Sequence, residues 1–231
     1  PYDWVNGTVV SNSDASQDYR EIVDDAVTVW FELENGDRVI AWTTTPWTLP
    51  ANSALAVNPK MTYLRMQDTD GNVYVVAKSR LAAYEKQFAN ATEIECIKGS
   101  DLVGKHYTPL FPYYAGQSDW LYQVIPADYV SDSDGTGIVH IAPAYGADDF
   151  WAAKAIDPKF PVLLNVDNYG NFTDEVVDFA GQNIFAATPA ILDWLKSNGK
   201  LIKKEQYKHS YPFGDRSKEK LIYRATDSWY I

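Results

Sequence analysis

Three adjacent hydroxyl groups are the first feature of the chain with a chemical use. The stretch "WTTTPWTLPAN" sets Thr43, Thr44 and Thr45 between Trp42 and a proline. Such a row can hold a water molecule and the oxygens of an ester. It can also be no more than the polar end of a strand, because threonine is a common strand residue. This stretch alone leaves both interpretations open.

A second stretch, "GTGIVHIAPAYGADDF", adds an imidazole and two carboxylates. Its glycines, Gly135 and Gly137, permit a close approach of the backbone to another group. His140 stands alone and suits a structural role, a pocket wall or a general base. Asp148 is expected to cap a helix. Asp149 is expected to point outward, with its charge favoured by the helix dipole, where it suits an ammonium group.

Local patterns predict the strands that hold these residues. Alternation over residues 39–44 predicts a strand, and Pro46 ends its pairing. This strand is the second half of a hairpin that turns at Asn35-Gly36, and another hairpin turns at Asp70-Gly71. A short strand precedes Pro143.

Three short helices are expected between the strands. They are residues 79–88 with Leu81, Tyr84 and Phe88 on one face, a helix that begins at Asp148 or Asp149, and a helix with Thr188 as N-cap and Asn198-Gly199 as its stop. Many strands, few helices and no βαβ rhythm predict a mixed fold of β with α, namely a β-barrel decorated by short helices.

Composition limits the class of protein. The 231 residues, 46% of them hydrophobic, suffice for one core and one domain, and no apolar run is long enough to span a membrane. The single cysteine, Cys96, is expected to be a buried hydrophobic residue in a reducing compartment. The cysteine and three scattered histidines have no spacing typical of a metal site.

Charge is unevenly distributed along the chain. The net charge of -11 argues against nonspecific nucleic-acid binding by the whole surface. Residues 200–224 nevertheless hold eight basic and three acidic residues. This segment is either a solvated face or a local contact for a phosphate backbone or a neighbouring domain. Because the chain opens on Pro1 without a signal peptide, we expect a segment of a longer polypeptide.

The two polar stretches together resemble the editing domain inserted in isoleucyl-tRNA synthetases. The resemblance continues through "VDNYGNFTDEVVDFAG" and "RSKEKLIYRATDSWY". It implies one editing domain over residues 1–231, with residues 200–231 as the return segment toward the synthetase body. Valyl enzymes differ in both polar stretches. Where the family often has Cys-Trp-Arg, this chain has Gly214-Asp215-Arg216, a change that bears on docking to the synthetase body and not on hydrolysis.

The resemblance implies post-transfer editing by an aminoacyl-tRNA deacylase of isoleucine–tRNA ligase. A positioned water would hydrolyse the ester of valine on tRNA(Ile), and isoleucine would be excluded by size. The implied catalytic residues are Thr44, Thr45 and Asp149, with Asp149 binding the substrate ammonium group. The implied substrate-binding residues come from both stretches: Trp42, Thr43, Asn52, Gly137, His140, Ile141 and Ala142.

The same resemblance implies partners and cofactors. The partners are the 3′ end of tRNA(Ile) charged with valine and the remainder of the parent synthetase, with no membrane. No cofactor or metal is expected for this domain, because ATP and Mg²⁺ serve amino-acid activation in the parent enzyme. A cytoplasmic monomer is expected. Two alternatives stay open: a noncatalytic module that binds the tRNA 3′ end, and a valyl-type editing domain that clears threonine.

Overall fold

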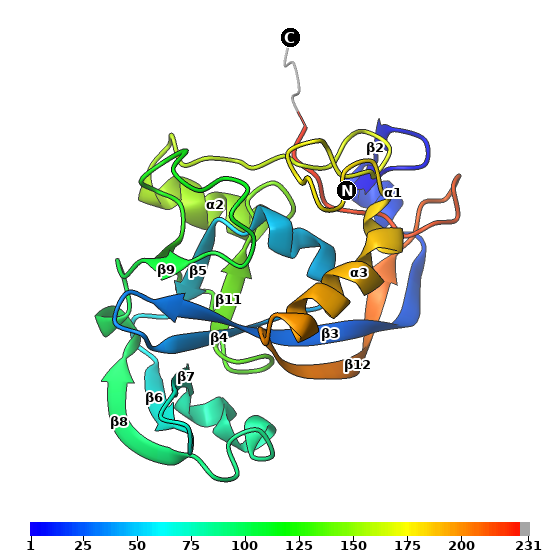
Figure 1. Ribbon diagram of the computed structural model, residues 1–231. Coiled ribbons are helices and arrows are strands. Elements are labelled where there is room, and N and C mark those ends of the chain that lie inside the picture. The colour runs from blue at the N-terminus through cyan, green and yellow to red at the C-terminus, as the bar shows by residue number, and fades with distance from the viewer. Residues whose placement is uncertain (227–231) are drawn as a thin grey trace.

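Figure 1 shows a curled β-sheet with short helices packed around it, in a computed structural model that describes residues 1–226. The strands of the structure are β1 Tyr2–Asp3, β2 Thr8–Val9, β3 Tyr19–Leu33, β4 Arg38–Thr43, β5 Ala54–Val57, β6 Thr62–Gln67, β7 Val73–Ala77, β8 Thr92–Lys98, β9 Tyr107–Thr108, β10 Gln123–Pro126, β11 Ile138–Ile141 and β12 Leu201–Pro212. β1 and β2 form a separate two-stranded sheet, and the other strands form the curled sheet. Its α-helices are α1 Asn12–Ala15, α2 Ala147–Ile156 and α3 Ile184–Ser197, and 3-10 helices cover Pro46–Ala51 (η1), Lys78–Tyr84 (η2) and Gly99–Asp101 (η3). The expected mixed β fold with few helices is confirmed.

Both predicted hairpins are present. β3 pairs antiparallel with β4, and β6 pairs antiparallel with β7. The turns contain Gly36 at φ 84° and Gly71 at φ 87°, a backbone conformation that only glycine adopts at little cost. These hairpins were predictable because the turn residue and the alternating strands lie side by side in the sequence.

A pairing between distant parts of the chain places β11 between β4 and β5. Val139 lies opposite Trp42 in a parallel pair, and His140 lies opposite Leu55 in an antiparallel pair. In the sequence, η1 connects β4 to β5. The other edge of β4 carries β3, so the sheet bends around this strand. The two polar stretches of the sequence therefore meet at the end of β4.

A long ribbon of β3 and β12 closes one side of the molecule, as Figure 1 shows. β12 was not predicted, because its sequence alternates lysine with polar and aromatic residues. It pairs with β3 from Leu201 opposite Val29 to Pro212 opposite Tyr19. Residues 201–212 are thus part of the sheet itself. The final five residues of the expected return segment lie outside the described residues.

The basic residues of this segment face acidic residues of β3. Lys204 Nζ lies 2.9 Å from Asp25 Oδ2, and Lys208 pairs with Glu21. Lys220, beyond the strand, pairs with Asp24. Part of the local positive charge is therefore matched by β3, an arrangement that neither sequence-based interpretation included.

Three expectations on local structure were wrong. Residues 78–84 form a 3-10 helix and not a longer α-helix, although Tyr84 and Phe88 are buried as predicted. α3 begins one turn early, because Asn183 caps it by accepting the Phe185 N–H. Cys96 is exposed, because β8 lies at the free edge of the sheet and pairs only with β6.

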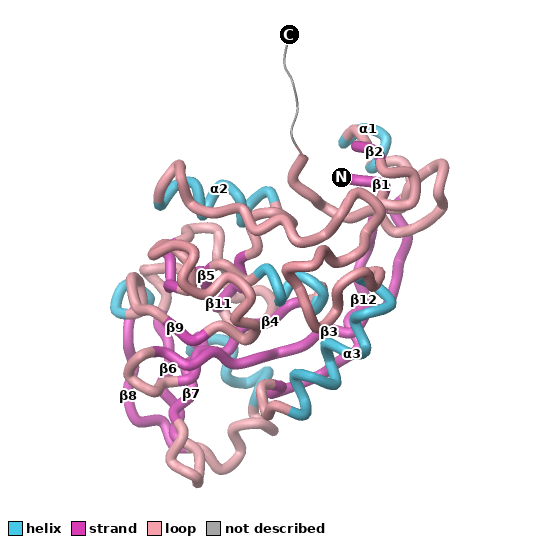
Figure 2. Tube along the Cα trace, turned by 45° about the horizontal axis from the view of Figure 1, so that its top comes forward, coloured by secondary structure: helices cyan, strands magenta, loops and turns pink. Residues whose placement is uncertain are grey.

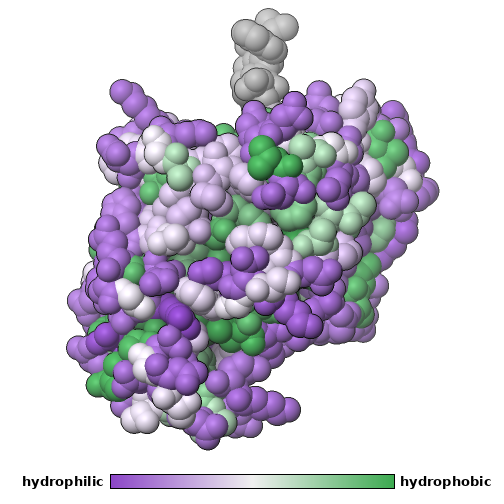
Figure 3. All heavy atoms as spheres, viewed as in Figure 1, coloured by the Kyte–Doolittle hydropathy of each residue, from purple (hydrophilic) through white to green (hydrophobic). Residues whose placement is uncertain are grey.

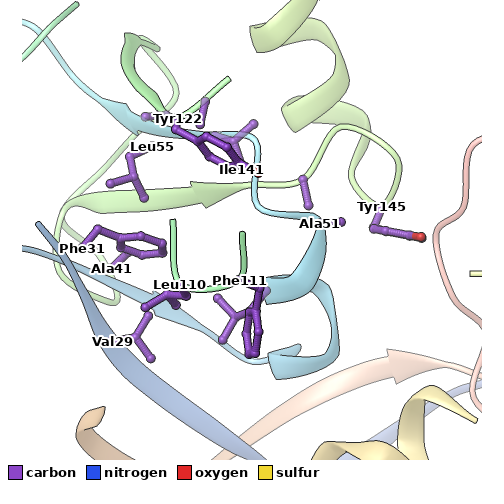
Figure 4. Packing of buried hydrophobic residues seen from close by; sticks show 14 of the residues in the cluster. Val29, Phe31, Ala41, Ala51, Leu55, Leu110, Phe111, Tyr122, Ile141 and Tyr145 are labelled. Atoms are coloured by element: carbon purple, nitrogen blue, oxygen red, sulfur yellow. The ribbon is translucent and has the colours of Figure 1, made fainter. Parts of the chain in front are cut away.

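The main core fills the inside of the curled sheet. In Figure 4, Phe31, Leu55 and Leu110 point toward one another from different parts of the chain. Figure 2 shows that loops make up much of the chain outside the sheet. On the face drawn in Figure 3, polar residues cover most of the surface, and apolar residues show in scattered patches between them. No helix within residues 1–226 has the length and apolar character needed to cross a bilayer.

Candidate functional site

Five of the predicted site residues line one hollow of about 330 Å³. They are Trp42, Thr43, Thr44, Gly137 and His140. Most of the remaining wall comes from the loop that leads into β11. This loop is clamped in place, because Thr136 Oγ1 donates to the Ile40 carbonyl at 2.7 Å. The structure thus brings the end of β4 and the start of β11 into a single concave surface.

Gly137 is required by this packing. Its φ is 76°, and a Cβ built on it would lie 2.4 Å from the Cβ of Ala77. The glycine therefore allows the loop to approach β7. Gly135 approaches Trp42 in the same way, where a Cβ would lie 3.2 Å from the tryptophan Cβ. The close approaches expected from these glycines are contacts with the protein's own strands.

The three threonines differ in how their hydroxyls are used. Thr43 Oγ1 accepts the Thr45 N–H at 3.0 Å, and the two hydroxyls are 3.2 Å apart. Thr45 Oγ1 also lies 3.4 Å from Thr48 Oγ1 in η1. Thr44, where pairing has ended, has a side chain with no hydrogen-bond partner within residues 1–226. Its hydroxyl is the one of the three left for a ligand.

Thr44 also borders a second hollow, of about 310 Å³. Thr45, Trp47, Phe185 and Tyr211 contribute to that wall, and the ion pair of Asp24 and Lys220 lies along it. The second hollow is therefore aromatic and polar. Among residues 1–226, only Thr44 lines both hollows.

His140 is buried, with 6% of its surface exposed, and both ring nitrogens have protein partners. Nε2 lies 2.9 Å from Thr48 Oγ1, and Nδ1 lies 2.8 Å from Asn52 Nδ2. Burial lowers the pKa of His140 to about 4, so the ring is neutral near pH 7. This geometry disfavours a general base at this position, because a base needs a free lone pair aimed at the water.

Three other predicted residues lie behind the hollow. Asn52 is buried between His140 and Tyr107. Ile141 and Ala142 are buried at the end of β11, where the Ala142 N–H donates to Asp149. Their side chains do not line the hollow. They support the residues that do.

Asp149 lies in the first turn of α2, which begins at Ala147 with Gly146 in the capping position. Asp148 is therefore not the cap that we expected. Asp149 Oδ2 accepts the Ala142 N–H at 2.8 Å, so the carboxylate folds back toward β11 and does not point freely outward. Gly146 makes room for it, because a Cβ there would lie 2.9 Å from Asp149 Cγ.

Burial raises the pKa of Asp149 to about 6, against the effect of the Ala142 N–H. Burial was not part of the sequence-based expectation, and it acts against the charge of the carboxylate. Asp149 itself lines neither hollow, but its charge acts on a residue that does. After burial, its charge is the largest cause that raises the pKa of Tyr129, which lines the first hollow. A carboxylate with a raised pKa gains from a cationic ligand.

Sequence reasoning missed three residues of this region: Thr48, Tyr107 and Tyr129. Thr48 lies in the same stretch as the threonine row, and the turn after Pro46 was the available signal. Tyr107 reaches Asn52 from β9, with its hydroxyl donating to Asn52 Oδ1 at 2.6 Å. Tyr107 and Tyr129 carry no local pattern that marks them.

Comparisons with known proteins give the relatives of this chain in sequence. No family model matches the chain. Isoleucine–tRNA ligase of Chlamydia muridarum is 42% identical over 234 residues, a match that includes all of this chain and 22% of the ligase. The probable cytoplasmic isoleucine–tRNA ligase of Dictyostelium discoideum is also 42% identical, again over all of this chain and over 23% of the ligase. The chain thus spans less than a quarter of the length of these curated relatives.

Solved structures agree on the fold. The crystal structure of GlLeuRS-CP1 superimposes with a TM-score of 0.62 at 18% identity, over 78% of this chain and 99% of that one. The cytosolic leucyl-tRNA synthetase editing domain of P. knowlesi gives 0.60 at 13% identity, over 80% and 97%. The chain matches a segment of isoleucine–tRNA ligases over its whole length, and it has the fold of the solved leucyl-tRNA synthetase editing domains. Residues of the first polar stretch line both hollows, and residues of the second stretch line the first hollow.

Proposed function

We propose that this editing domain hydrolyses the ester that joins valine to the 3′ end of tRNA(Ile). Water adds to the ester carbonyl carbon, the bond to the ribose oxygen breaks, and valine and uncharged tRNA leave. The observation that carries the proposal is the position of Thr44, whose unpartnered hydroxyl borders both hollows. An ester with its amino acid in one hollow and its nucleoside in the other would pass this hydroxyl.

Each residue then has a part in holding the substrate. Asp149 binds the ammonium group of valine, through the carboxylate oxygen that Ala142 does not occupy. Thr44 holds the water or the ester oxygens, while Thr43 and Thr45 keep the end of β4 in shape. Such an ester is labile beside an ammonium group, so positioning supplies most of what the reaction needs. Trp42, Gly137 and His140 form the wall of the amino-acid hollow.

This activity is needed because a single binding site cannot reject valine strongly enough in favour of isoleucine. Isoleucyl synthetases are the established example: one methylene is worth only about 1–3 kcal/mol of binding. A second pocket too small for isoleucine corrects the error. We assign the size limit to His140, since its ring is held in place from both nitrogens. The tRNA, the rest of a longer synthetase and the cytoplasm are the proposed partners and location.

The test is single-turnover deacylation by this chain of Val-tRNA(Ile), Ile-tRNA(Ile) and Thr-tRNA(Val). We expect rapid release of valine and little release of isoleucine. Preferred release of threonine would support the valyl-type alternative, and binding without hydrolysis would support the noncatalytic module. His140→Ala enlarges the pocket, so this variant should begin to hydrolyse Ile-tRNA(Ile) while it still hydrolyses Val-tRNA(Ile). If His140→Ala instead loses both activities while it still binds, the size-limit role is wrong.

A further inference from the structure

A buried set of hydrogen bonds runs from β9 to the threonine row. The Tyr107 hydroxyl donates to Asn52 Oδ1 at 2.6 Å, and Asn52 Nδ2 donates to the Ala54 carbonyl at 3.0 Å. Asn52 Nδ2 also lies 2.8 Å from His140 Nδ1. The side chains of Tyr107, Asn52 and His140 are each at most 6% exposed, so water does not compete for these contacts.

The orientation of the Asn52 amide follows from two of these partners. The Ala54 carbonyl accepts only, so it requires the NH₂ group of Asn52 on its side. The Tyr107 hydroxyl donates to the other side, where the amide oxygen accepts. Burial raises the pKa of Tyr107 well above 10, so its hydroxyl keeps its proton. The NH₂ group therefore faces both Ala54 and His140.

These contacts determine the tautomer of the His140 imidazole. Nδ1 receives a hydrogen from Asn52 and must itself be bare, so the single ring proton of the neutral form lies on Nε2. Nε2–H donates to Thr48 Oγ1 at 2.9 Å, and Thr48 donates to the Thr45 carbonyl at 2.8 Å. Every donor in this series points the same way, toward the turn that carries the threonines.

We propose that Tyr107 and Asn52 are positioning residues that hold His140 as the Nε2–H tautomer and thereby hold the Thr45–Thr48 turn beside the site. His140 is thus a hydrogen-bond donor to the protein and takes no proton from the attacking water. The consequence for catalysis rests on the proposed deacylation, but the tautomer itself does not. Within residues 1–226, the ring's hydrogen bonds go only to Asn52 and Thr48, and no charged group contributes to its pKa.

The wild-type chain tests the proposal directly by nitrogen-15 NMR of its imidazole rings. The chain has three histidines, so His106→Gln and His209→Gln identify the signals of His140. We expect a bare Nδ1 and a protonated Nε2 on His140, unchanged from pH 5.5 to pH 8. A proton on Nδ1, a mixture of the two tautomers, or a titration near pH 6.5 would overturn the proposal without any use of tRNA.

Two variants test the roles of the partners. Asn52→Asp replaces the NH₂ donor by an acceptor, so the proton should move to Nδ1 or the ring should become doubly protonated. Deacylation of Val-tRNA(Ile) should then fall at least tenfold and gain a new step in its pH profile. A folded Asn52→Asp protein with an unchanged His140 spectrum would contradict the role of Asn52.

Tyr107→Phe removes one hydroxyl and keeps the shape of the ring. We expect a second His140 tautomer, or a faster exchange of the Nε2 proton, together with a several-fold slower reaction. Tyr122→Phe is the matched control, because its ring packs against Tyr107 with centroids 6.0 Å apart and its buried hydroxyl has no hydrogen-bond partner among the described residues. Equal effects of the two substitutions on the His140 spectrum would refute the role of Tyr107.

Discussion

At the scale of single residues, the three threonines divide the work of one short stretch. Thr43 and Thr45 bind each other and the backbone, so their hydroxyls shape the end of β4. Thr44 has no such partner within residues 1–226 and faces both hollows. A row of identical side chains therefore contains two structural members and one that is available to a substrate.

Valine substitutions separate these roles, because valine keeps the branched shape of threonine. Thr44→Val should slow single-turnover deacylation of Val-tRNA(Ile) about ten- to a hundredfold, from the loss of about 1–3 kcal/mol of polar contact, at an unchanged melting temperature. Thr45→Val should slow the reaction and also lower stability by about 1–2 kcal/mol, because Thr43 and Thr48 lose a partner. A Thr44→Val rate within twofold of the parent would return Thr44 to the status of an ordinary strand residue.

Asp149 illustrates a conflict between stability and binding. Its pKa is about 6 in the folded protein and 3.8 in an unperturbed chain, so the folded state holds the proton more tightly. The group therefore supports stability at low pH. That support is lost as the pH rises from about 4 through 6, where the unfolded chain has already released its proton.

Asp149→Asn should accordingly raise the free energy of unfolding at pH 7.5 by about 1–3 kcal/mol and leave it unchanged near pH 3.5. The amide oxygen can still accept the Ala142 N–H, so the fold is retained. Deacylation should fall at least tenfold, because the ammonium group loses its counter-charge. Urea unfolding at the two pH values checks the first effect. In the parent protein, kcat/KM should decline below about pH 6, and near-normal activity of the variant would remove Asp149 from the site.

At the scale of elements, the loop before β11 depends on a glycine with two separate requirements. Gly137 has a positive φ, and it also touches β7 so closely that no Cβ fits. Gly71 has a positive φ of 87° but nothing within 4 Å of its Cβ direction. The two positions therefore separate backbone strain from steric overlap.

Gly71→Ala should cost about 1 kcal/mol, the effect of the backbone alone. Gly137→Ala should cost about 3 kcal/mol or more and slow deacylation, because the wall of the first hollow must move away from Ala77. Chemical denaturation of both variants beside the parent gives the comparison. Equal losses of stability would show that the contact with Ala77 is not limiting.

Elements were predictable from the sequence where their causes are local. Both hairpins follow from a glycine turn between alternating strands, and β11 follows from its flanking glycine and proline. The start of α3 was misplaced because Thr188 and Pro189 form a convincing cap signal inside a helix that Asn183 already caps. β12 was missed because its partner β3 lies almost the whole chain away, so its charged sequence is explained only by the acidic strand beside it.

The residues of the candidate site were likewise predictable only where their signal is local in the sequence. Trp42, the threonines, His140 and Asp149 stood out because polar residues gathered at strand and helix ends. Tyr107 could not be found, since nothing near it in the sequence reveals that its hydroxyl lies against Asn52. The raised pKa of Asp149 was also beyond sequence reasoning, because it depends on burial by segments that meet only in the folded chain.

At the scale of the whole molecule, the charge pattern argues against broad electrostatic attraction of tRNA. The chain carries a net charge of -11, and the basic residues around β12 include several that are paired with β3. For the proposed substrate, we expect recognition to depend on the two hollows and on few phosphate contacts. A protein that makes 6–10 phosphate contacts loses about 10³–10⁵ in affinity between 50 and 200 mM salt.

We therefore expect the KM of this chain for Val-tRNA(Ile) to rise less than about tenfold over the same range of salt. The measurement is deacylation at several KCl concentrations, with a melting curve at each one as the control for stability. A thousandfold rise in KM at unchanged stability would show that many lysines are free to bind phosphate, against the pairing described above.

The insertion of β11 between β4 and β5 also has a consequence for the order in which the protein is made. β4 and β5 leave the ribosome first, whereas the strand that fills the space between them follows roughly 100 residues after Trp42. Until it arrives, both strands present backbone edges that another extended segment can occupy. The nascent chain thus has a gap between β4 and β5, where the wall of the first hollow will form. Contacts this distant in sequence form slowly. The proposed activity can appear only after β11 has filled this gap, so a chaperone that shields such edges would act on the same stretch to which we assign the ester.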